Sequence, residues 1–247
     1  MGLFDKLKKQ EAKTERISIF ETDYPINKSS WFEVFSACLG QVMAIQDACG
    51  EQVVQGQNWE VDFATGQLIF GKKSYPVQFL GSESNSSNTW KWGFDNVNGF
   101  PESLIKLANE TRHLGEKWNL EPLCMADFKL NDTFNGHNLS VVACGVSEDN
   151  YCYYRGPHDG GAVLMAFSDV PNSVFNPVDV HKFVSIAMNC LESFSIEHKI
   201  FIESFLHWNN TVYNWEGNTI VADFSQKLHI EFEQVEEFLR ISSMKVR

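Results

Sequence analysis

Two tryptophans one residue apart, Trp90 and Trp92, with Phe94 two residues further on, constrain the fold of this chain more than any other feature. Side chains alternate between the two faces of a β-strand, so this spacing places all three rings on one face of a strand over residues 90–94. Because surface sheets rarely leave three large rings exposed, we expect them inside a sheet that packs on the first helix. The alternative is an exposed platform that stacks on a flat ligand or on a partner.

The composition is that of a folded globular protein with an excess of negative charge. The chain has 247 residues, 43% of them hydrophobic and 13% aromatic, which is enough for a substantial core. The net charge is −12, and residues 1–16, with five basic and three acidic residues, carry +2, which leaves about −14 on the remainder. An acidic body repels phosphate groups, so we expect a basic protein partner and no nucleic acid.

Cysteine usage and hydropathy favour a cytoplasmic protein. The six cysteines are far apart, and most lie in apolar stretches, as expected for buried thiols in a reducing compartment. No signal-peptide core and no run of 18 apolar residues occurs, so we expect neither secretion by that route nor a membrane span. Residues 1–20 are expected to form a flexible tail, with weak contact to an anionic membrane surface as the alternative.

The first half of the chain predicts two helices with short strands between them. Ser30 can cap a helix that runs to about residue 48 and ends at Gly50. Pro101 lies at the start of a second helix that runs to the region of Trp118. Short β segments are expected at 59–63, 67–70, 75–80 and 90–94.

The second half predicts further strands and two more helices. Pro177 opens one helix, and Ser195 can cap another that runs to about Trp208. The segment 234–240 fits either a short terminal helix or a further strand. The remaining β segments are expected at 123–130, 139–146, 151–155, 162–167, 211–215, 219–224 and 228–232.

These elements predict an α+β protein, in which antiparallel β-sheets pack against several helices and a β-hairpin element closes the C-terminus. We expect a first α+β half over 21–119 and a second over 120–247, together in one compact unit. In both halves, strands with a glycine- or serine-rich hairpin lead into a helix that proline opens. This order raises the hypothesis of two degenerate α/β repeats.

The Trp90–Phe94 strand and its surroundings resemble an uncharacterised bacterial protein family of unknown function. The similar segments are a Trp-x-x-Asp, a Gly-Ser pair, a Ser-x-Thr-Trp-x-Trp strand and a Tyr-Arg-x-Pro-x-x-Gly-Gly hairpin, which stand here at Trp59 and Asp62, Gly81-Ser82, 87–92 and 154–161. Phe94 stands where a tryptophan would be commoner. The resemblance covers roughly residues 56–168, and it implies a bacterial cytoplasmic setting and no catalytic residues.

The tip of the hairpin at 156–161 is the best candidate for chemistry. Arg155, His158 and Asp159 offer a cation, an imidazole and a carboxylate on a turn whose glycines permit close backbone approach. Cys152 could act as a thiol nucleophile if it shared the face of His158. The same Gly-Pro-x-x-Gly-Gly sequence is also what a five- or six-residue hairpin loop needs, which is the structural interpretation.

Other chemical motifs are weaker. Asp62 is a further candidate for binding, although an Asp in this position commonly caps a turn, here at Thr65 or Gly66. The histidines never pair at i,i+3 or i,i+4, and no H-E-x-x-H, nucleotide-binding loop or nucleophile elbow occurs. We therefore expect no metal and no cofactor.

The sequence favours a non-enzymatic cytoplasmic binding protein, regulatory or immunity-like, that engages a basic partner through an acidic, aromatic-bearing surface. The alternative is an enzyme or small-molecule binder with its site between the Trp90/Trp92 strand and the Arg155–Asp159 hairpin. Convergence of Arg155, His158 and an acid such as Asp62 or Asp95 in one pocket would favour that alternative.

Overall fold

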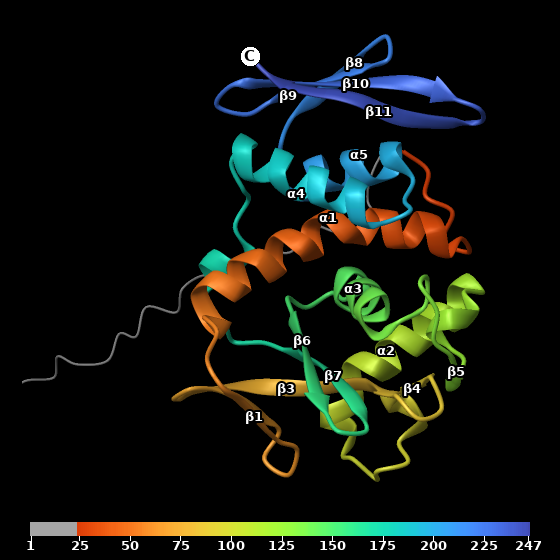
Figure 1. Cartoon of the computed structure of the whole chain (residues 1–247), viewed down its shortest axis with the longest axis vertical. Coiled ribbons are helices and arrows are strands. Elements are labelled where there is room, and N and C mark those ends of the chain that lie inside the picture. The colour runs from red at the N-terminus through yellow and green to blue at the C-terminus, as the bar shows by residue number, and fades with distance from the viewer. Residues whose placement is uncertain (1–23) are drawn as a thin grey trace, which may run out of the picture.

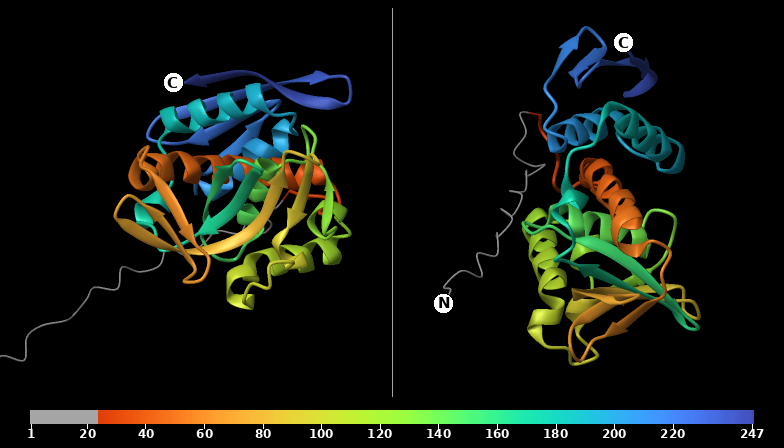
Figure 2. Two further views of the ribbon diagram at one scale, coloured as in Figure 1. Left: turned by 60° about the horizontal axis from the view of Figure 1, so that its bottom comes forward. Right: turned by 90° about the vertical axis from the view of Figure 1, so that its left-hand side faces the viewer.

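The computed structural model describes residues 24–247, so the expected tail at 1–20 lies outside the described residues. Within this range, five α-helices are arranged with two antiparallel sheets, which confirms the predicted α+β class. From bottom to top, Figure 1 shows the larger sheet, helix α3, helix α1, the pair α4 and α5, and a smaller C-terminal sheet. Figure 2 shows the same succession of layers from two further sides.

Four of the five helices begin where a side chain accepts from one of their first backbone N–H groups, and the helix that follows Pro101 is the exception. Ser30 Oγ accepts from Glu33 N at 3.4 Å and caps the first helix, as predicted. The cap of the last helix is Glu197, whose Oε2 accepts from Ile200 N at 2.7 Å, so the predicted cap at Ser195 is wrong. The five helices are α1 (Trp31–Cys49), α2 (Glu102–Trp118), α3 (Gly136–Val146), α4 (Val180–Ser193) and α5 (His198–Trp208).

The first helix does not end at Gly50 as the sequence suggested. Gly50 has ordinary right-handed helical angles, and a π-helical turn, Gly50–Val54, follows it. The chain leaves the helix only at Gln55, which is left-handed with φ 50°. Short 3₁₀ turns lie at Gly93–Asp95, Glu121–Leu123 and Asn172–Phe175.

The larger sheet joins segments from both predicted halves. Its longest strand, β3, pairs with β2, β4 and β7, and β7 pairs in turn with β6. All these pairs are antiparallel, and β1 and β5 lie at the two ends of the β1-β2-β3-β4-β5 path. The strands are β1 (Trp59–Asp62), β2 (Gln67–Phe70), β3 (Lys73–Ser84), β4 (Thr89–Trp92), β5 (Asp127–Lys129), β6 (Cys152–His158) and β7 (Gly161–Phe167).

The tryptophan strand lies in the core. Trp90 and Trp92 are 0% and 1% exposed, which confirms the core interpretation for these two rings. The strand ends at Trp92, earlier than predicted, and the half-buried Phe94 lies in the 3₁₀ turn that follows, although its ring still stacks on Trp92 at 5.7 Å. Trp92 Nε1 donates to the carbonyl oxygen of Pro122, after α2, at 2.9 Å.

The segment 139–146, predicted as a strand, is the helix α3. Asn135 accepts from the backbone N–H of Asn138 at 3.0 Å and caps it. Nearly all residues of α3 are buried, and from Val141 to Val146 they are all small or apolar. A short buried helix of this kind shows no helical periodicity in its sequence, and its β-branched residues imitate a strand.

The C-terminal sheet is larger than the predicted hairpin element. The expected hairpin and third strand are present, and the segment 234–240 contributes to a fourth strand instead of a terminal helix. The sheet has the order β11-β10-β9-β8. Its strands are β8 (Tyr213–Glu216), β9 (Thr219–Asp223), β10 (Lys227–Val235) and β11 (Phe238–Val246).

Helix α1 is the centre of the molecule. It contacts α3 and β6 toward the larger sheet, and α4 and α5 toward the C-terminal sheet (Figure 1). Most of its side chains are buried, and one apolar core runs through both regions. Among residues 24–247, none of the helices has both the length and the apolar character that a membrane crossing requires.

Candidate functional site

Arg155, on β6, is bound to a carboxylate from another strand. Its Nε and Nη2 both lie 2.8 Å from Oε2 of Glu83, on β3. Oε1 of Glu83 accepts from the backbone N–H of Gly136, at the start of α3, at 2.7 Å. The Glu83 side chain is only 9% exposed, and that of Arg155 is 34% exposed. This ion pair therefore ties the hairpin, β3 and α3 together.

His158 and Asp159 lie at the exposed tip of the hairpin. The strands continue to His158 and Gly161, so the turn is shorter than the expected five or six residues. Gly160 N donates to Nδ1 of His158 at 3.1 Å, which engages one nitrogen of the ring in the turn itself. The Arg155 guanidinium turns away from this tip and binds Glu83.

Asp62 holds the turn after β1. Its Oδ2 accepts from Thr65 Oγ1 at 2.7 Å, and its Oδ1 accepts from the backbone N–H groups of Ala64 and Thr65 at 2.9 and 3.3 Å. The hydrogen bonds from Thr65 lower the pKa of Asp62 below its usual value. The side chain thus makes the turn contact with Thr65 that the sequence predicted.

One strand of the sheet, β3, lies between the tryptophan strand β4 and the β6–β7 hairpin. β3 pairs with β4 on one edge and with β7 on the other, and β7 separates β3 from β6. Asp95, the other acid considered for this site, binds Lys91 at 2.7 Å. Arg155, His158, Asp62 and Asp95 therefore each contact a different neighbour.

His137 is a neighbour of Arg155 that the sequence did not point to. It is the second residue of α3, and its Nδ1 lies 3.4 Å from the hydroxyl of Tyr153, on β6. Partial desolvation of the ring, and then the positive charge of the Arg155 guanidinium, lower the pKa of His137. The signal was hidden because the segment beside it was expected to be a strand.

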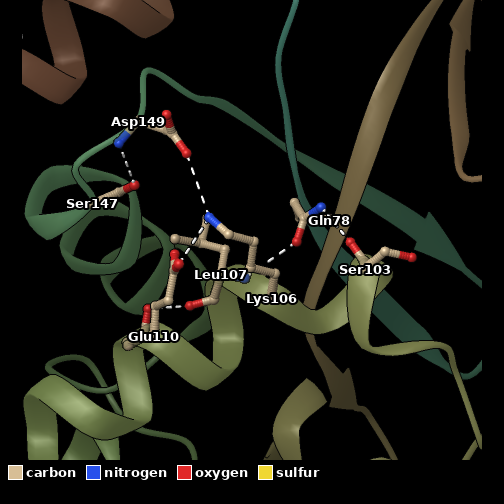
Figure 3. Close-up of polar contacts among 8 residues, drawn as sticks. Gln78, Ser103, Lys106, Leu107, Glu110, Ser147 and Asp149 are labelled. Carbon is tan, nitrogen blue, oxygen red and sulfur yellow. Dashed lines mark hydrogen bonds and ion pairs between the residues drawn. The ribbon is translucent and has the colours of Figure 1, made fainter.

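A second polar cluster joins α2 to its neighbours (Figure 3). Lys106 Nζ lies 2.8 Å from Glu110 and 3.5 Å from Asp149, so its charge is balanced by two carboxylates. Gln78, on β3, accepts from the backbone N–H of Leu107 at 3.2 Å and donates to the Ser103 carbonyl at 2.7 Å. These contacts, drawn in Figure 3, fix α2 on the sheet.

The cysteines do not offer a reactive thiol. All six are free and five are buried, including Cys152, which was considered as a nucleophile. Burial raises the pKa of Cys190 to about 12 and that of Cys152 well above its usual value. Among residues 24–247 no group of three or more His, Cys, Asp or Glu side chains is placed to hold a metal ion.

A concave surface with an aromatic lining lies between α1 and α4 and is called here the α1–α4 groove. It consists of a wide hollow of about 490 Å³ and a narrow one of about 120 Å³, which share Ser193 and Phe194. The wide hollow is lined by Ser30, Trp31, Phe32, Phe35, Asp132, Thr133, Asn138, Ser193, Phe194 and Ser195. The narrow hollow is lined by Met43, Asp47, Ile186, Asn189, Cys190, Ser193 and Phe194.

Aromatic rings form the wall of the wide hollow. The ring of Trp31 stacks on that of Phe35 at 5.9 Å and meets the edge of Phe134 at 5.1 Å. Phe194, from the connection between α4 and α5, lies 5.6 Å from Phe35. Rings held in this way by their neighbours offer a rigid apolar surface, which is typical of binding sites.

The charge of the groove has one sign. Asp132 lies in the wide hollow and Asp47 in the narrow one, and no lysine or arginine is among the described residues that line either. Asp47 is bound by Lys182, which also reaches Glu51 at 3.2 Å, so these three groups together carry one negative charge. The groove therefore presents negative charge at both ends.

The sequence of the chain matches one family model, described as a family of unknown function (DUF6882), over residues 33–170. The chain belongs to this family. No curated protein and no solved structure matches it. The DUF6882 region contains α1 from its third residue on, the whole larger sheet, α2 and α3, while α4, α5 and the C-terminal sheet lie beyond it.

Two tryptophans of the DUF6882 region pack on glycines. A Cβ atom on Gly81 would lie 2.4 Å from Cζ2 of Trp90, and one on Gly156 would lie 2.5 Å from Cη2 of Trp59. Each ring therefore occupies space that a side chain on the facing glycine would fill. Packing therefore accounts for four of the residues on which the family resemblance was based, Trp59, Gly81, Trp90 and Gly156.

The α1–α4 groove crosses the limit of the DUF6882 region. One wall is α1, with the 132–138 segment at its wide end, and both belong to the region that the family model matches, except for Ser30, Trp31 and Phe32 at the start of the wall. The opposite wall, α4 with Phe194, lies beyond that region. Sequence reasoning missed this site because its lining comes from three distant segments, none of which carries a motif.

Proposed function

We propose that this protein is a non-enzymatic binding module that holds a segment of a basic protein in the α1–α4 groove. The observation that carries the proposal is the groove itself, which combines a rigid aromatic wall with a carboxylate in each hollow. Buried aromatic anchors supply most of the energy of protein interfaces, and opposite charge guides the partner to them. The net charge of −12 extends this attraction over the whole chain.

The candidate catalytic residues give less support to an enzyme. Arg155 is neutralised by Glu83, Asp62 binds its own turn and His158 lies at an exposed tip. A general acid or base must share a pocket with the group on which it acts. Roles for these residues, and for Asp159, in binding a partner remain a prediction.

A small ligand is the second candidate for the same groove. The wide hollow, at about 490 Å³, falls within the usual size of small-molecule sites. A thermal-shift screen with nucleotides, metabolites and metals tests this candidate, because a ligand that binds only the folded state raises its melting temperature. A stabiliser whose effect is lost in Ser193→Arg would favour the small ligand over the protein partner.

We place this binding module in the cytoplasm of a bacterium. The six free cysteines suit a reducing compartment, and the bacterial setting follows from the family resemblance of the sequence. A regulatory or immunity-like role would suit an acidic protein whose partner is basic. Identification of the partner is the measurement that tests this role.

The test compares two single substitutions on the same helix. Ser193 is exposed and lines the groove, whereas Ser185 is exposed on α4 and lines neither hollow. Affinity capture from cell lysate should recover a stoichiometric basic protein with the wild type and with Ser185→Arg, and should lose it with Ser193→Arg. Equal recovery by both variants would rule out the groove as the binding site.

A further inference from the structure

We infer that the segment held in the α1–α4 groove is an amphipathic helix of about four turns, with an apolar stripe and a Lys or Arg near each end. This inference rests on the proposed function and states which kind of partner segment the groove takes. Four properties of the groove support it: its length, the chemistry of its middle part, the size of the residues on its floor and the position of its carboxylates.

The length of the groove follows from the helix that forms one wall. The lining residues of α1 run from Trp31 to Asp47, and at 1.5 Å per residue this distance is about 24 Å. The opposite wall repeats at helical spacing, with Ile186, Asn189 and Cys190 followed by Ser193. A valley between two helices accepts a third helix, whose side chains fit between their ridges.

The middle of the groove favours a helix over an extended peptide. Met43, Ile186, Cys190 and Phe194 meet there and offer no strong hydrogen-bonding group. The described polar lining residues nearby are Asn189 and Ser193 on α4 and Asp47 at the end. An extended peptide would leave most of its backbone N–H and C=O groups without partners on this surface. A helix satisfies these groups within itself and presents only side chains.

Two of the polar groups at the wide end are already engaged within the chain. Ser30 Oγ accepts from Glu33 N, and Nδ2 of Asn138 donates to the carbonyl oxygens of Asp132 and Thr133 at 3.2 and 3.0 Å. They therefore hold the groove in shape and offer few hydrogen bonds to a peptide backbone. At this end too, these two groups do not favour an extended peptide over a helix.

Residue size also suits an incoming helix. Cys190 and Ser193 are small, so a helix can approach α4 closely at these positions. The wide hollow beside Trp31, Phe35 and Phe194 is large enough for a bulky side chain, such as leucine or phenylalanine. The partner helix is thus expected to place its largest apolar residue at the wide end.

The carboxylates define the charged positions of the partner. Asp132 lies at the wide end and Asp47, with Glu51 and Lys182, at the narrow end. A helix that spans the groove would bring residues about 16 positions apart next to these two ends. Lysine or arginine at both positions would neutralise them, and their long stems would cover the apolar rim.

The experiment uses synthetic peptides as probes of the full chain. The reference peptide is an 18-residue helix former with leucines at i, i+4, i+7 and i+11 and lysines near both ends. One control replaces two central residues by proline, which breaks the helix. A second control replaces the lysines by glutamates. Binding of each labelled peptide is measured by fluorescence anisotropy on the wild type, on Ser193→Arg and on Ser185→Arg.

The reference peptide should bind the wild type and Ser185→Arg at least about tenfold more tightly than either control peptide binds, and Ser193→Arg should lose it. Asp132→Asn should weaken its binding about threefold at low salt and less at high salt. If the proline peptide bound as tightly as the reference peptide, the inference that the segment is helical would be wrong. If the glutamate peptide bound as tightly, the inference that the segment is basic would be wrong.

The outcomes separate this inference from the proposed function. If no probe peptide binds while Ser193→Arg still abolishes capture of a lysate protein, the groove is a binding site and the helical occupant is wrong. If Ser193→Arg leaves both peptide binding and capture unchanged, the proposed function fails as well. Melting curves of the two serine variants show whether either substitution has unfolded the chain.

Discussion

The DUF6882 region and the C-terminal region that follows it are held by different kinds of contact. In the DUF6882 region, tryptophan rings fit against glycines, as Trp90 does on Gly81 and Trp59 on Gly156. In the C-terminal region, polar groups of the α5 segment bind the last sheet. Ile241 N donates to Nδ1 of His198 at 3.0 Å, and Arg240 Nη1 donates to the Ile196 carbonyl at 2.8 Å.

A third contact of this kind involves a buried acid. Glu203, on α5, is 4% exposed, and its Oε1 accepts from Trp215 Nε1, on β8, at 2.8 Å. Steric contacts between rings and backbone do not depend on pH, whereas His198 and Glu203 both titrate. The comparison teaches that the tryptophan–glycine contacts of the first region should respond mainly to changes of volume, and the contacts of His198 and Glu203 in the second mainly to changes of protonation.

The largest effect is expected from Gly81→Ala. The new Cβ would lie 2.4 Å from the Trp90 ring and 2.5 Å from the backbone oxygen of Lys91, so the ring or the strand must move. We expect a loss of about 3 kcal/mol in the free energy of unfolding, measured in urea. Gly50→Ala is the control, because Gly50 is helical with open space around it and should be neutral or slightly stabilising. A Gly81→Ala protein as stable as the wild type would show that packing on glycine is dispensable.

Glu83→Gln tests the ion pair of the DUF6882 region. The substitution keeps an oxygen for Gly136 N and removes the charge that Arg155 binds, so we expect a loss of about 2 kcal/mol in urea unfolding. Arg155→Met and the double variant complete a double-mutant cycle. A coupling energy near zero would mean that Arg155 and Glu83 act independently. The DUF6882 region would then be stabilised by steric contacts and not by this ion pair.

His198 should make the C-terminal region sensitive to acid. Burial, and then the nearby Arg240, lower its pKa to about 4, while the unfolded chain has the ordinary value near 6.5. The folded state therefore holds the neutral ring, and its contribution is complete above pH 6.5 and is lost as the pH falls toward 4. Because the His198 side chain is only half-buried, solvent screens part of this effect and we expect only about 1 kcal/mol.

Hydrogen exchange measures this effect locally. The difference in protection of the β11 amides between wild type and His198→Gln should shrink as the pH is lowered from 7 to 4, after correction for the intrinsic exchange rate. The β3 amides should show no such change. An equal loss of protection in β3 and β11 would show that the two regions do not differ in their response to pH.

The smallest effect is expected from Glu203→Gln, and it has the opposite sign. Burial raises the pKa of Glu203, so its stabilising contribution is complete at low pH and is lost as the pH rises through the folded pKa. Glutamine keeps an acceptor for Trp215 and removes the buried charge, so stability at pH 7 should rise by up to about 1 kcal/mol and stay unchanged near pH 4. A clear destabilisation at pH 7 would show that the carboxylate is needed in its charged form.

Much of the fold could be predicted because its signals are local. The cap at Ser30, the strand that contains Trp90 and Trp92, and the hairpin that joins β6 to β7 all depend on residues close together in the chain. The prediction for α3 was wrong because nearly all of its residues are buried, so its sequence does not alternate between an apolar and a polar face. The Asn135 cap, three residues before Asn138, was the available signal.

The candidate site could not be predicted in the same way. The titratable residues at the hairpin attracted attention because of their chemistry, yet Arg155 is bound to Glu83, 72 positions earlier in the chain. The groove is made of ordinary core-like residues such as Phe35 and Phe194. Their common surface exists only after α4 has packed beside α1, and no local pattern records that event.

The position of α1 has a consequence for how this family can vary. One side of α1 is covered by α3 and the other by α5 (Figure 1). Only α3 lies in the region that the family model matches. A fragment of residues 33–170 would leave an apolar side of α1 in water and should aggregate. Any relative that keeps α1 must cover that side with some element of its own, so the boundary of shared sequence is not a place where the protein can be cut.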